Sequence, residues 1–268
     1  MAYTTIDDPR LHFQSVLFAG NGSGASSTQS ITLGGDSDMQ PDLVWFKKRD
    51  GAEDHELFDS IRGVQKALDS NNNNAEATGR GLTAFNSNGF TVGNGTDSGN
   101  QGATNEINKN FVCWCWKAGG SASSDSNGDI TSSVSANTTA GFSIVSYTGN
   151  ASSNQTVGHG LGGVPQMIIS KNRDNTSTNY NDWIVYHHSN ATANDTKLKL
   201  NTTDAASSTN EWGDTDPTST VYSVHTSGDG ATNDGTDKIV SYVWTSIKGF
   251  SKFGKYEGNG NNDGPVVY

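Results

Sequence analysis

The sequence has few cysteines, few prolines and little positive charge. It contains two Cys and five Pro in 268 residues, and 17 basic residues against 28 acidic ones give a net charge of −11. This negative charge disfavours sequence-independent binding to phosphate groups, so we expect neither nucleic acid nor an anionic membrane surface as a partner. No apolar run approaches the ~20 residues of a membrane span, so we expect no membrane insertion.

A secretion signal is also missing from the first twenty residues. Asp7, Asp8 and Pro9 stand where a signal peptide needs a basic start and an unbroken apolar stretch. We therefore expect a chain that is made in the cytoplasm and stays soluble there unless it leaves inside a larger assembly.

The two cysteines, Cys113 and Cys115, flank Trp114. On a strand they share one face with Cα atoms roughly 6.5–7 Å apart, near the upper limit for a disulfide. No further Cys or His stands nearby at metal-ligand spacing. We predict two thiols packed in a core, with neither a disulfide nor a bound metal.

Turn-forming and small polar residues dominate what is present. Gly, Asn, Ser and Thr number 32, 28, 32 and 28, whereas hydrophobic residues make up 32% and charged residues 17%. Short β-type runs alternate with Asn-Gly and Asp-Gly dipeptides, which supply the positive φ angles of tight hairpins. The main runs are FQSVLF (13–18), QSITL (29–33), DLVWFKK (42–48), FVCWCW (111–116), FSIVSY (142–147), QMIISK (166–171), DWIVYHH (182–188) and KIVSYVW (238–244). The pattern predicts an all-β protein with antiparallel connections.

The sequence repeats itself with a period near 129 residues. Three sets of matches carry this repeat: Phe13, Phe18, Gly20 and Asn21 with Phe142, Tyr147, Gly149 and Asn150; Pro41, Arg49 and Asp50 with Pro165, Arg173 and Asp174; and Trp114 and Gly119 with Trp244 and Gly249. Such a period is too long for a solenoid unit and fits a duplicated β-sandwich. A third copy begins at Tyr256, Gly258 and Asn259 and ends with the chain at Tyr268.

These matches predict two tandem antiparallel, jelly-roll-like β-sandwiches, over residues 1–120 and 121–249. Residues 250–268 are then the start of a third repeat or a strand that pairs with a neighbouring chain. Segment 121–141 fits a linker or a strand, and 61–69 fits a short helix or a strand with a loop. Trp45, Trp114, Trp116 and Trp244 lie in apolar runs and are expected in the interior of their own repeat.

No motif predicts catalysis, and we expect no catalytic residues. The single G-x-G-x-x-G at 158–163 is followed by a β-like run rather than by the helix that a dinucleotide site requires. Paired carboxylates for sugar hydrolysis leave no local trace, so a polysaccharide-degrading enzyme stays an alternative. The run 125–129 resembles part of a calcium loop, but an EF-hand would need Glu where Ala136 stands. We expect no cofactor, with an irregular calcium site left open.

One strand is a candidate binding face. Trp183, Tyr186, His187 and His188 lie within six residues, and exposed Trp and Tyr serve sugar-binding surfaces as flat apolar platforms. Residues 183, 185 and 187 should face one way and 184, 186 and 188 the other. Ordinary packing inside a sandwich is the alternative reading of this strand.

Seven long stretches carry a resemblance to a known family: MAYTTIDDP (1–9), HELFDSIRG (55–63), FVCWCWKAGG (111–120), GDITSSVSANTTAGFSIVSYTGN (128–150), VGHGLGGVPQMIISKNRD (157–174), DWIVYHH (182–188) and GFSKFGKYEGNGNNDGPVVY (249–268). They resemble repeat-built virion proteins of tailed phages that infect marine bacteria, labelled tail-fibre-like or uncharacterised. The resemblance implies a place in a particle and no catalytic residues. It also implies a chain that is truncated at Tyr268.

The resemblance therefore implies a non-enzymatic structural protein on the exterior of the virion, as a tail fibre or a capsid-attached fibre or knob. Other virion proteins, further copies of the chain in a trimer, and a host-surface glycan are the expected partners. A phage protein is made in the host cytoplasm and released by lysis, which agrees with the missing signal peptide. A lectin-like carbohydrate-binding module is the alternative function.

Overall fold

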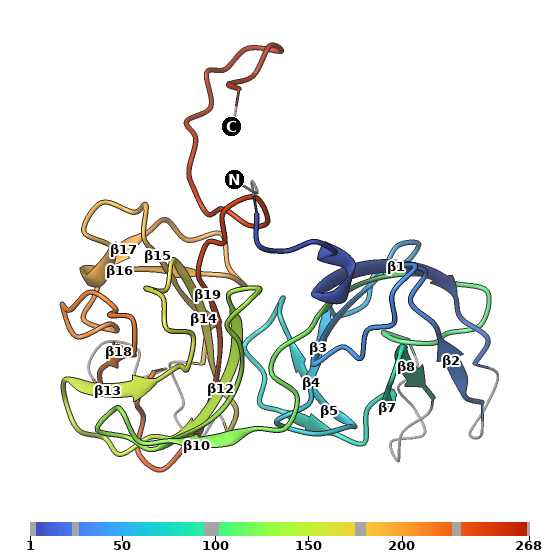
Figure 1. Cartoon of the computed structure of the whole chain (residues 1–268), viewed down its shortest axis with the longest axis horizontal. Coiled ribbons are helices and arrows are strands. Elements are labelled where there is room, and N and C mark those ends of the chain that lie inside the picture. The colour runs from blue at the N-terminus through green and yellow to red at the C-terminus, as the bar shows by residue number, and fades with distance from the viewer. Residues whose placement is uncertain (1–3, 23–26, 94–101, 175–180, 227–231, 267–268) are drawn as a thin grey trace.

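The protein is all-β and consists of two β-sandwiches that lie side by side (Figure 1). The computed structural model describes residues 4–22, 27–93, 102–174, 181–226 and 232–266. The described helical segments are two short 3₁₀ turns, η1 (Pro9–Leu11) and η2 (Ala193–Asp195). None of the described helices is long and apolar enough to cross a membrane.

The first sandwich packs a six-stranded sheet on a three-stranded sheet. The six strands, in spatial order, are β1 (Phe13–Ala19), β9 (Asn110–Trp116), β3 (Leu43–Lys48), β4 (Glu56–Asp59), β5 (Lys66–Asp69) and β6 (Ala77–Thr78). The three strands are β2 (Gln29–Ile31), β8 (Gly89–Val92) and β7 (Leu82–Asn86). Every pairing between these strands is antiparallel, as the Asn-Gly and Asp-Gly turns predict.

The second sandwich packs an eight-stranded sheet on a two-stranded sheet. The eight strands, in spatial order, are β10 (Ser123–Asp125), β11 (Ser132–Asn137), β12 (Phe142–Thr148), β19 (Lys238–Trp244), β14 (Met167–Asn172), β15 (Ile184–His187), β16 (Thr196–Lys199) and β17 (Ser207–Ser208). The two strands are β13 (Gln155–Gly158) and β18 (Val221–Val224). Segment 121–141 is therefore strand and turn rather than linker, and 61–69 is a turn followed by a strand.

Strand order and register relate the two sandwiches as copies. Strands β1, β9, β3, β4, β5 and β6 occupy the same order as β12, β19, β14, β15, β16 and β17. Phe13 and Leu43 both pair with Trp116, and Phe142 and Met167 both pair with Trp244. The counterpart of Trp244 is therefore Trp116, not Trp114, so the match drawn from the sequence at this strand was two residues out of register.

Repeated polar residues hold the loops of both copies in the same way. Asp50 accepts a hydrogen bond from the first backbone N–H of β9, at 3.0 Å, and Asp174 accepts the equivalent bond from β19, at 2.8 Å. The amides of Asn21 and Asn105 bond to each other, as do those of Asn150 and Asn233. The repeated Arg-Asp and Gly-Asn pairs in the sequence are thus loop anchors.

Each sandwich has its own hydrophobic core between its two sheets. The first core is built mainly of aliphatic and Phe side chains and contains both cysteines, which are buried free thiols as predicted. Burial raises the pKa of both thiols. The second core contains Trp212, Tyr147, Tyr186 and Tyr222.

A third buried cluster joins the two repeats, because the outer faces of the two large sheets pack against each other. Leu43, Leu57 and Leu68 from the first repeat meet Ile144 and other apolar residues of the second repeat. Of the four tryptophans expected inside their own repeat, Trp244 belongs to this cluster and Trp45 and Trp116 pack against it. Trp114, the fourth, is half-buried. Trp183, the binding-face candidate, also belongs to the cluster. In the run FVCWCW the cysteines face the core, so the alternate tryptophans lie on the outer face of the sheet.

The segment after β19 leaves the body of the protein as an extended arm (Figure 1). Ser251 forms an isolated bridge with Ile247, and residues 252–266 contain no strand. The strands expected for a third repeat are therefore not formed in the described residues. Gly, Asn and Asp make up most of residues 257–264, and these residues are depleted in strands.

Candidate functional site

The predicted binding strand is mostly buried. Trp183 and Tyr186 are 0% and 4% exposed. Trp183 faces the neighbouring repeat and donates its indole N–H to the backbone oxygen of Asp69 at 2.8 Å, whereas Tyr186 packs in the core of the second repeat. The alternation of faces predicted for this strand is correct, but neither ring is available as a sugar platform.

The two histidines of this strand lie nearer the surface. His188 is exposed, His187 is half-buried, and their rings stack with centroids 5.3 Å apart. His188 Nε2 lies 3.1 Å from the backbone oxygen of Phe253, so it contacts the start of the C-terminal arm. Two of the four candidate residues are therefore buried, His187 is half-buried, and His188 contacts the arm.

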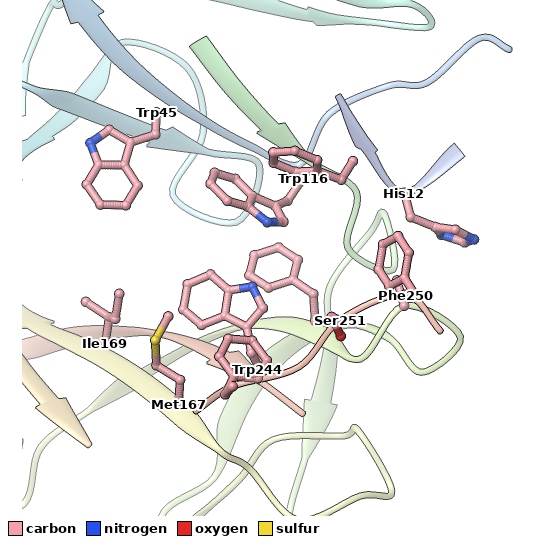
Figure 2. Close-up of a pocket in the computed structure, with 12 residues that line it drawn as sticks. His12, Trp45, Trp116, Met167, Ile169, Trp244, Phe250 and Ser251 are labelled. Atoms are coloured by element: carbon pink, nitrogen blue, oxygen red, sulfur yellow. The ribbon is translucent and has the colours of Figure 1, made fainter. Parts of the chain in front are cut away.

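A different aromatic site lies between the two repeats (Figure 2). It is a pocket of about 300 Å³, lined by His12, Phe13, Trp45, Trp116, Ala140, Phe142, Met167, Ile169, Trp244, Phe250, Ser251 and Phe253. Figure 2 shows Trp45 and Trp116 reaching from the first repeat toward Met167, Ile169 and Trp244 of the second. The volume is at the low end of the roughly 300–1,000 Å³ of ligand pockets, so it fits one small ligand or one side chain.

Contacts among the aromatic rings fix the wall of this pocket. The ring of Trp116 lies 6.3 Å from those of Phe142 and Trp244, and Phe142 and Trp244 lie 5.1 Å apart. Such edge and tilted pairs are the favoured arrangements of aromatic rings. Trp116 and Trp244 are the equivalent residues of the two repeats, so the pocket is formed where the copies meet.

One of the polar residues of the pocket is His12, which packs edge-on against Phe250 with centroids 5.9 Å apart (Figure 2). Asn137 donates a 3.0 Å hydrogen bond to His12 Nδ1, which fixes that nitrogen as the acceptor. Burial, together with the charge of Lys117, lowers the pKa of His12 below its ordinary value. His12 is therefore neutral at neutral pH, and the pocket carries no charge.

This lining suits binding of an apolar surface. His12 and Ser251 are the polar residues among the twelve that line the pocket. One feature of the sequence indicates the site. Strands β3, β9 and β19 are apolar on both faces, and a strand of this kind is buried on both faces of its sheet. The pattern does not show that the layer covering the outer face of each sheet is the other repeat.

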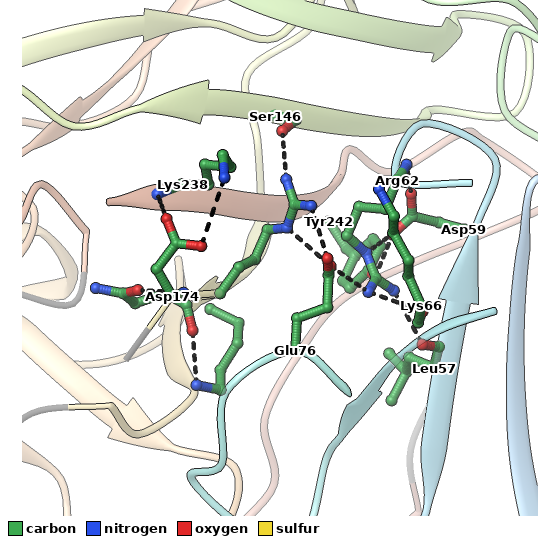
Figure 3. A network of polar contacts seen from close by, with 12 residues as sticks. Leu57, Asp59, Arg62, Lys66, Glu76, Ser146, Asp174, Lys238 and Tyr242 are labelled. Atoms are coloured by element: carbon green, nitrogen blue, oxygen red, sulfur yellow. Dashed lines mark hydrogen bonds and ion pairs between the residues drawn. The ribbon is translucent and has the colours of Figure 1, made fainter. Parts of the chain in front are cut away.

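A buried polar network also ties the two repeats together (Figure 3). Arg62 is fully buried; it forms an ion pair with Asp59 and donates to Glu76 at 3.0 Å. From the second repeat, Arg173 donates two 2.9 Å bonds to Glu76, and Tyr242 donates a 2.8 Å bond to Asp59. The two arginines lower the pKa of Glu76 despite its burial. These contacts anchor the repeats to each other.

Glu56 and Asp69 form a pair of neighbouring carboxyl residues, and paired carboxylates are typical of enzymes that hydrolyse sugars. Glu56 and Asp69 are directly paired across β4 and β5, and burial raises the pKa of Glu56 to about 8. Arg80 Nη1 approaches Glu56 at 3.4 Å. The side chain of Glu56 is 0% exposed, so no polysaccharide can reach it.

The other motifs of the sequence form turns. Asp125 accepts two hydrogen bonds from Asn127 and so forms a local turn. The glycine-rich run 158–163 connects β13 to β14 without a helix. Within the described part of the chain, no group of three His, Cys, Asp or Glu side chains could hold a metal ion.

Residues 8–268 match the family described as Domain of unknown function (DUF7483), and the chain belongs to this family. No curated protein matches the chain. No solved structure matches it either.

Proposed function

We propose that this member of the DUF7483 family is a non-enzymatic structural protein on the exterior of a phage virion, as a tail fibre or a capsid-attached fibre or knob. The observation that carries the proposal is the joint between the repeats. Two copies of one sandwich are fused through an apolar cluster and a buried ion-pair network into one unit. A chain of such units is stiff and offers few places for a protease to cut.

Two further features support the proposal. A net charge of −11 on an Asn-, Ser- and Thr-rich surface keeps closely spaced copies hydrated and apart. The resemblance of the sequence to repeat-built phage proteins supports a place in the virion. We propose other virion proteins and further copies of the chain as partners, and no cofactor. The trimer expected from the sequence stays a prediction.

The test uses purified particles of the phage that encodes the chain. We expect mass spectrometry to detect the chain in particles that have been banded on a density gradient. We also expect a gold-labelled antibody against the chain to mark the outer surface of intact particles by electron microscopy. A chain found only in the soluble fraction of the lysate would overturn the proposal.

Carbohydrate recognition is the second candidate, and the pocket of Figure 2 is the observation that favours it. A sugar ring could stack its apolar face on Trp45 or Trp116, as it does on exposed rings elsewhere. A glycan array with the wild-type chain and with Trp45→Ala tests this. We expect binding to be lost in Trp45→Ala and kept in Met167→Leu, a volume-conserving control at the same pocket. Absence of binding to every glycan would remove this candidate.

A further inference from the structure

Strand β1 leaves one edge of the six-stranded sheet open. The bonds from Lys117 N to His12 O (2.9 Å) and from Gly20 N to Lys109 O (2.8 Å) show that even-numbered residues of this strand bond to β9. The backbone groups of Phe13, Ser15 and Leu17 therefore point away from β9. No backbone hydrogen bond reaches them from any residue that the structure describes.

The second repeat shows what such an edge can accept. Strand β12 occupies the position of β1, and β11 pairs with it from Ser133↔Ser146 to Asn137↔Phe142. The backbone groups that β11 covers on β12 are the equivalents of those left open on β1. The same strand of the fold is thus paired on both sides in one copy and on one side in the other.

Strand β1 also lacks the features that protect exposed edges in natural sheets. Edge strands are blunted by lysine, proline, bulges or short length. The seven residues FQSVLFA contain no charge and no proline, and their register with β9 runs without a bulge. Leu17 is 63% exposed, which is high for a leucine on a strand.

From these observations we infer that β1 is a homotypic interface, at which a second copy of the chain adds its own β1 in the antiparallel direction. A two-fold axis through Ser15 places Ser15 opposite Ser15 and Phe13 opposite Leu17 of the other copy. In this register the open backbone groups of each copy face those of the other. The exposed Leu17 is then covered by an aromatic ring, and two six-stranded sheets become one continuous sheet.

The second copy fits this edge better than the C-terminal arm does. The arm is held on the second repeat by Phe253, whose N–H donates to Ser246 Oγ at 3.3 Å. Beyond it, the stretch 257–264 reads EGNGNNDG, which is rich in residues that are depleted in strands. Strand β1 is itself a well-formed, uncharged strand, so an identical strand is its best complement. The inference does not depend on the virion role, and a two-fold pair would make a dimer in place of a trimer.

Disulfide trapping tests the register. Residues opposite each other in a hydrogen-bonded antiparallel pair have Cα atoms about 5.5 Å apart, within disulfide range. We expect Ser15→Cys to form a covalent dimer under mild oxidation, whereas the exposed Ser30→Cys in the same repeat stays monomeric on a denaturing gel. The native thiols are buried and do not compete. A mixture of Leu17→Cys and Tyr256→Cys chains that cross-links instead would assign the edge to the arm and overturn the inference.

Mass measurement tests the interface without cross-linking. We expect light scattering to give a dimer for the full chain at tens of micromolar. Ser15→Pro removes an N–H that faces away from β9, so the sheet within each copy is kept. We expect this variant to need at least a tenfold higher protein concentration than the wild type to form the dimer. Ser15→Val keeps the N–H and should keep the dimer. A wild-type monomer or trimer, or a Ser15→Pro variant that melts like wild type and still dimerises, would overturn the inference.

Discussion

Glu76 shows how one side chain serves both repeats. It belongs to the first repeat, yet its carboxylate is shared by Arg62 from that repeat and Arg173 from the other. Its backbone N–H also donates to the backbone oxygen of Arg173 at 2.8 Å. Removing one partner of a buried ion pair costs more than the pair itself contributes, because the remaining charge loses its compensation.

We predict that Glu76→Gln is less stable than wild type at neutral pH and that the difference disappears in acid. The pKa of Glu76 is lowered in the folded protein, so its contribution is present above the ordinary carboxyl pKa and lost as pH falls through the folded value. Melting temperatures of both proteins between pH 7 and pH 3 check this. A difference that stays constant with pH would contradict the role given to the carboxylate.

At this scale the sequence predicted some environments and missed others. The spacing of Cys113 and Cys115 was enough to predict two buried thiols, because both lie on one strand face. Trp183 and Tyr186 were considered as a binding surface, but both strand faces are covered. A strand pattern gives the alternation of side chains; it does not say whether the outer face meets water or a second sheet.

Among the elements, the turn after β1 recurs with the same construction after its counterpart β12. Gly20 and Gly149 end β1 and β12 where the backbone passes close to a facing loop. A Cβ at Gly20 would lie 2.2 Å from the backbone oxygen of Glu106, and at Gly149 2.5 Å from that of Asp234. The repeated Gly-Asn pair is thus required by close approach of two backbones.

We predict that Gly20→Ala and Gly149→Ala each lower the free energy of unfolding by about 1–3 kcal/mol, the usual cost of overpacking. Gly34→Ala is the matched control, because no atom lies within 4 Å of its Cβ position. Its effect should be near zero or slightly stabilising. Denaturant titration measures all three. Equal stability of the three variants would contradict the close-approach explanation.

The strands themselves were largely predictable from the sequence. Alternating apolar runs bounded by Asn-Gly and Asp-Gly gave the long strands, and the duplication gave their equivalence. The equivalence of Trp116 and Trp244 in the two repeats was missed because the sequence FVCWCW contains two tryptophans two residues apart. Only the strand register shows which of them corresponds to Trp244. Short strands such as β6 and β17 have no pattern long enough to detect.

In the whole molecule, the packing of one repeat on the other was the feature that the sequence did not reveal. Strands β3, β9 and β19 are apolar on both faces, and a pattern of this kind fits any covering layer. Arg62 is a further link, since it lies 3.3 Å from the Tyr242 hydroxyl of the other repeat and is wholly buried. The two sandwiches should therefore not unfold independently.

We predict a single transition for the two repeats in differential scanning calorimetry. Arg62→Ala leaves the buried Asp59 without its cation and removes one of the two arginines that pair with Glu76, so it should lower the free energy of unfolding by about 3–5 kcal/mol. The exposed Lys238→Ala is the control and should change little. Two well-separated transitions in the wild-type chain would contradict coupled repeats.

The position of the tryptophans decides what an optical experiment on this protein can see. Four of the six indoles, Trp45, Trp116, Trp183 and Trp244, lie in or against the cluster between the repeats, whereas Trp212 sits in a core. Intrinsic fluorescence should therefore change when the halves separate, even if each half stays folded. Tryptophan emission spectra therefore report the packing of the two repeats on each other, whereas circular dichroism reports the content of β-sheet.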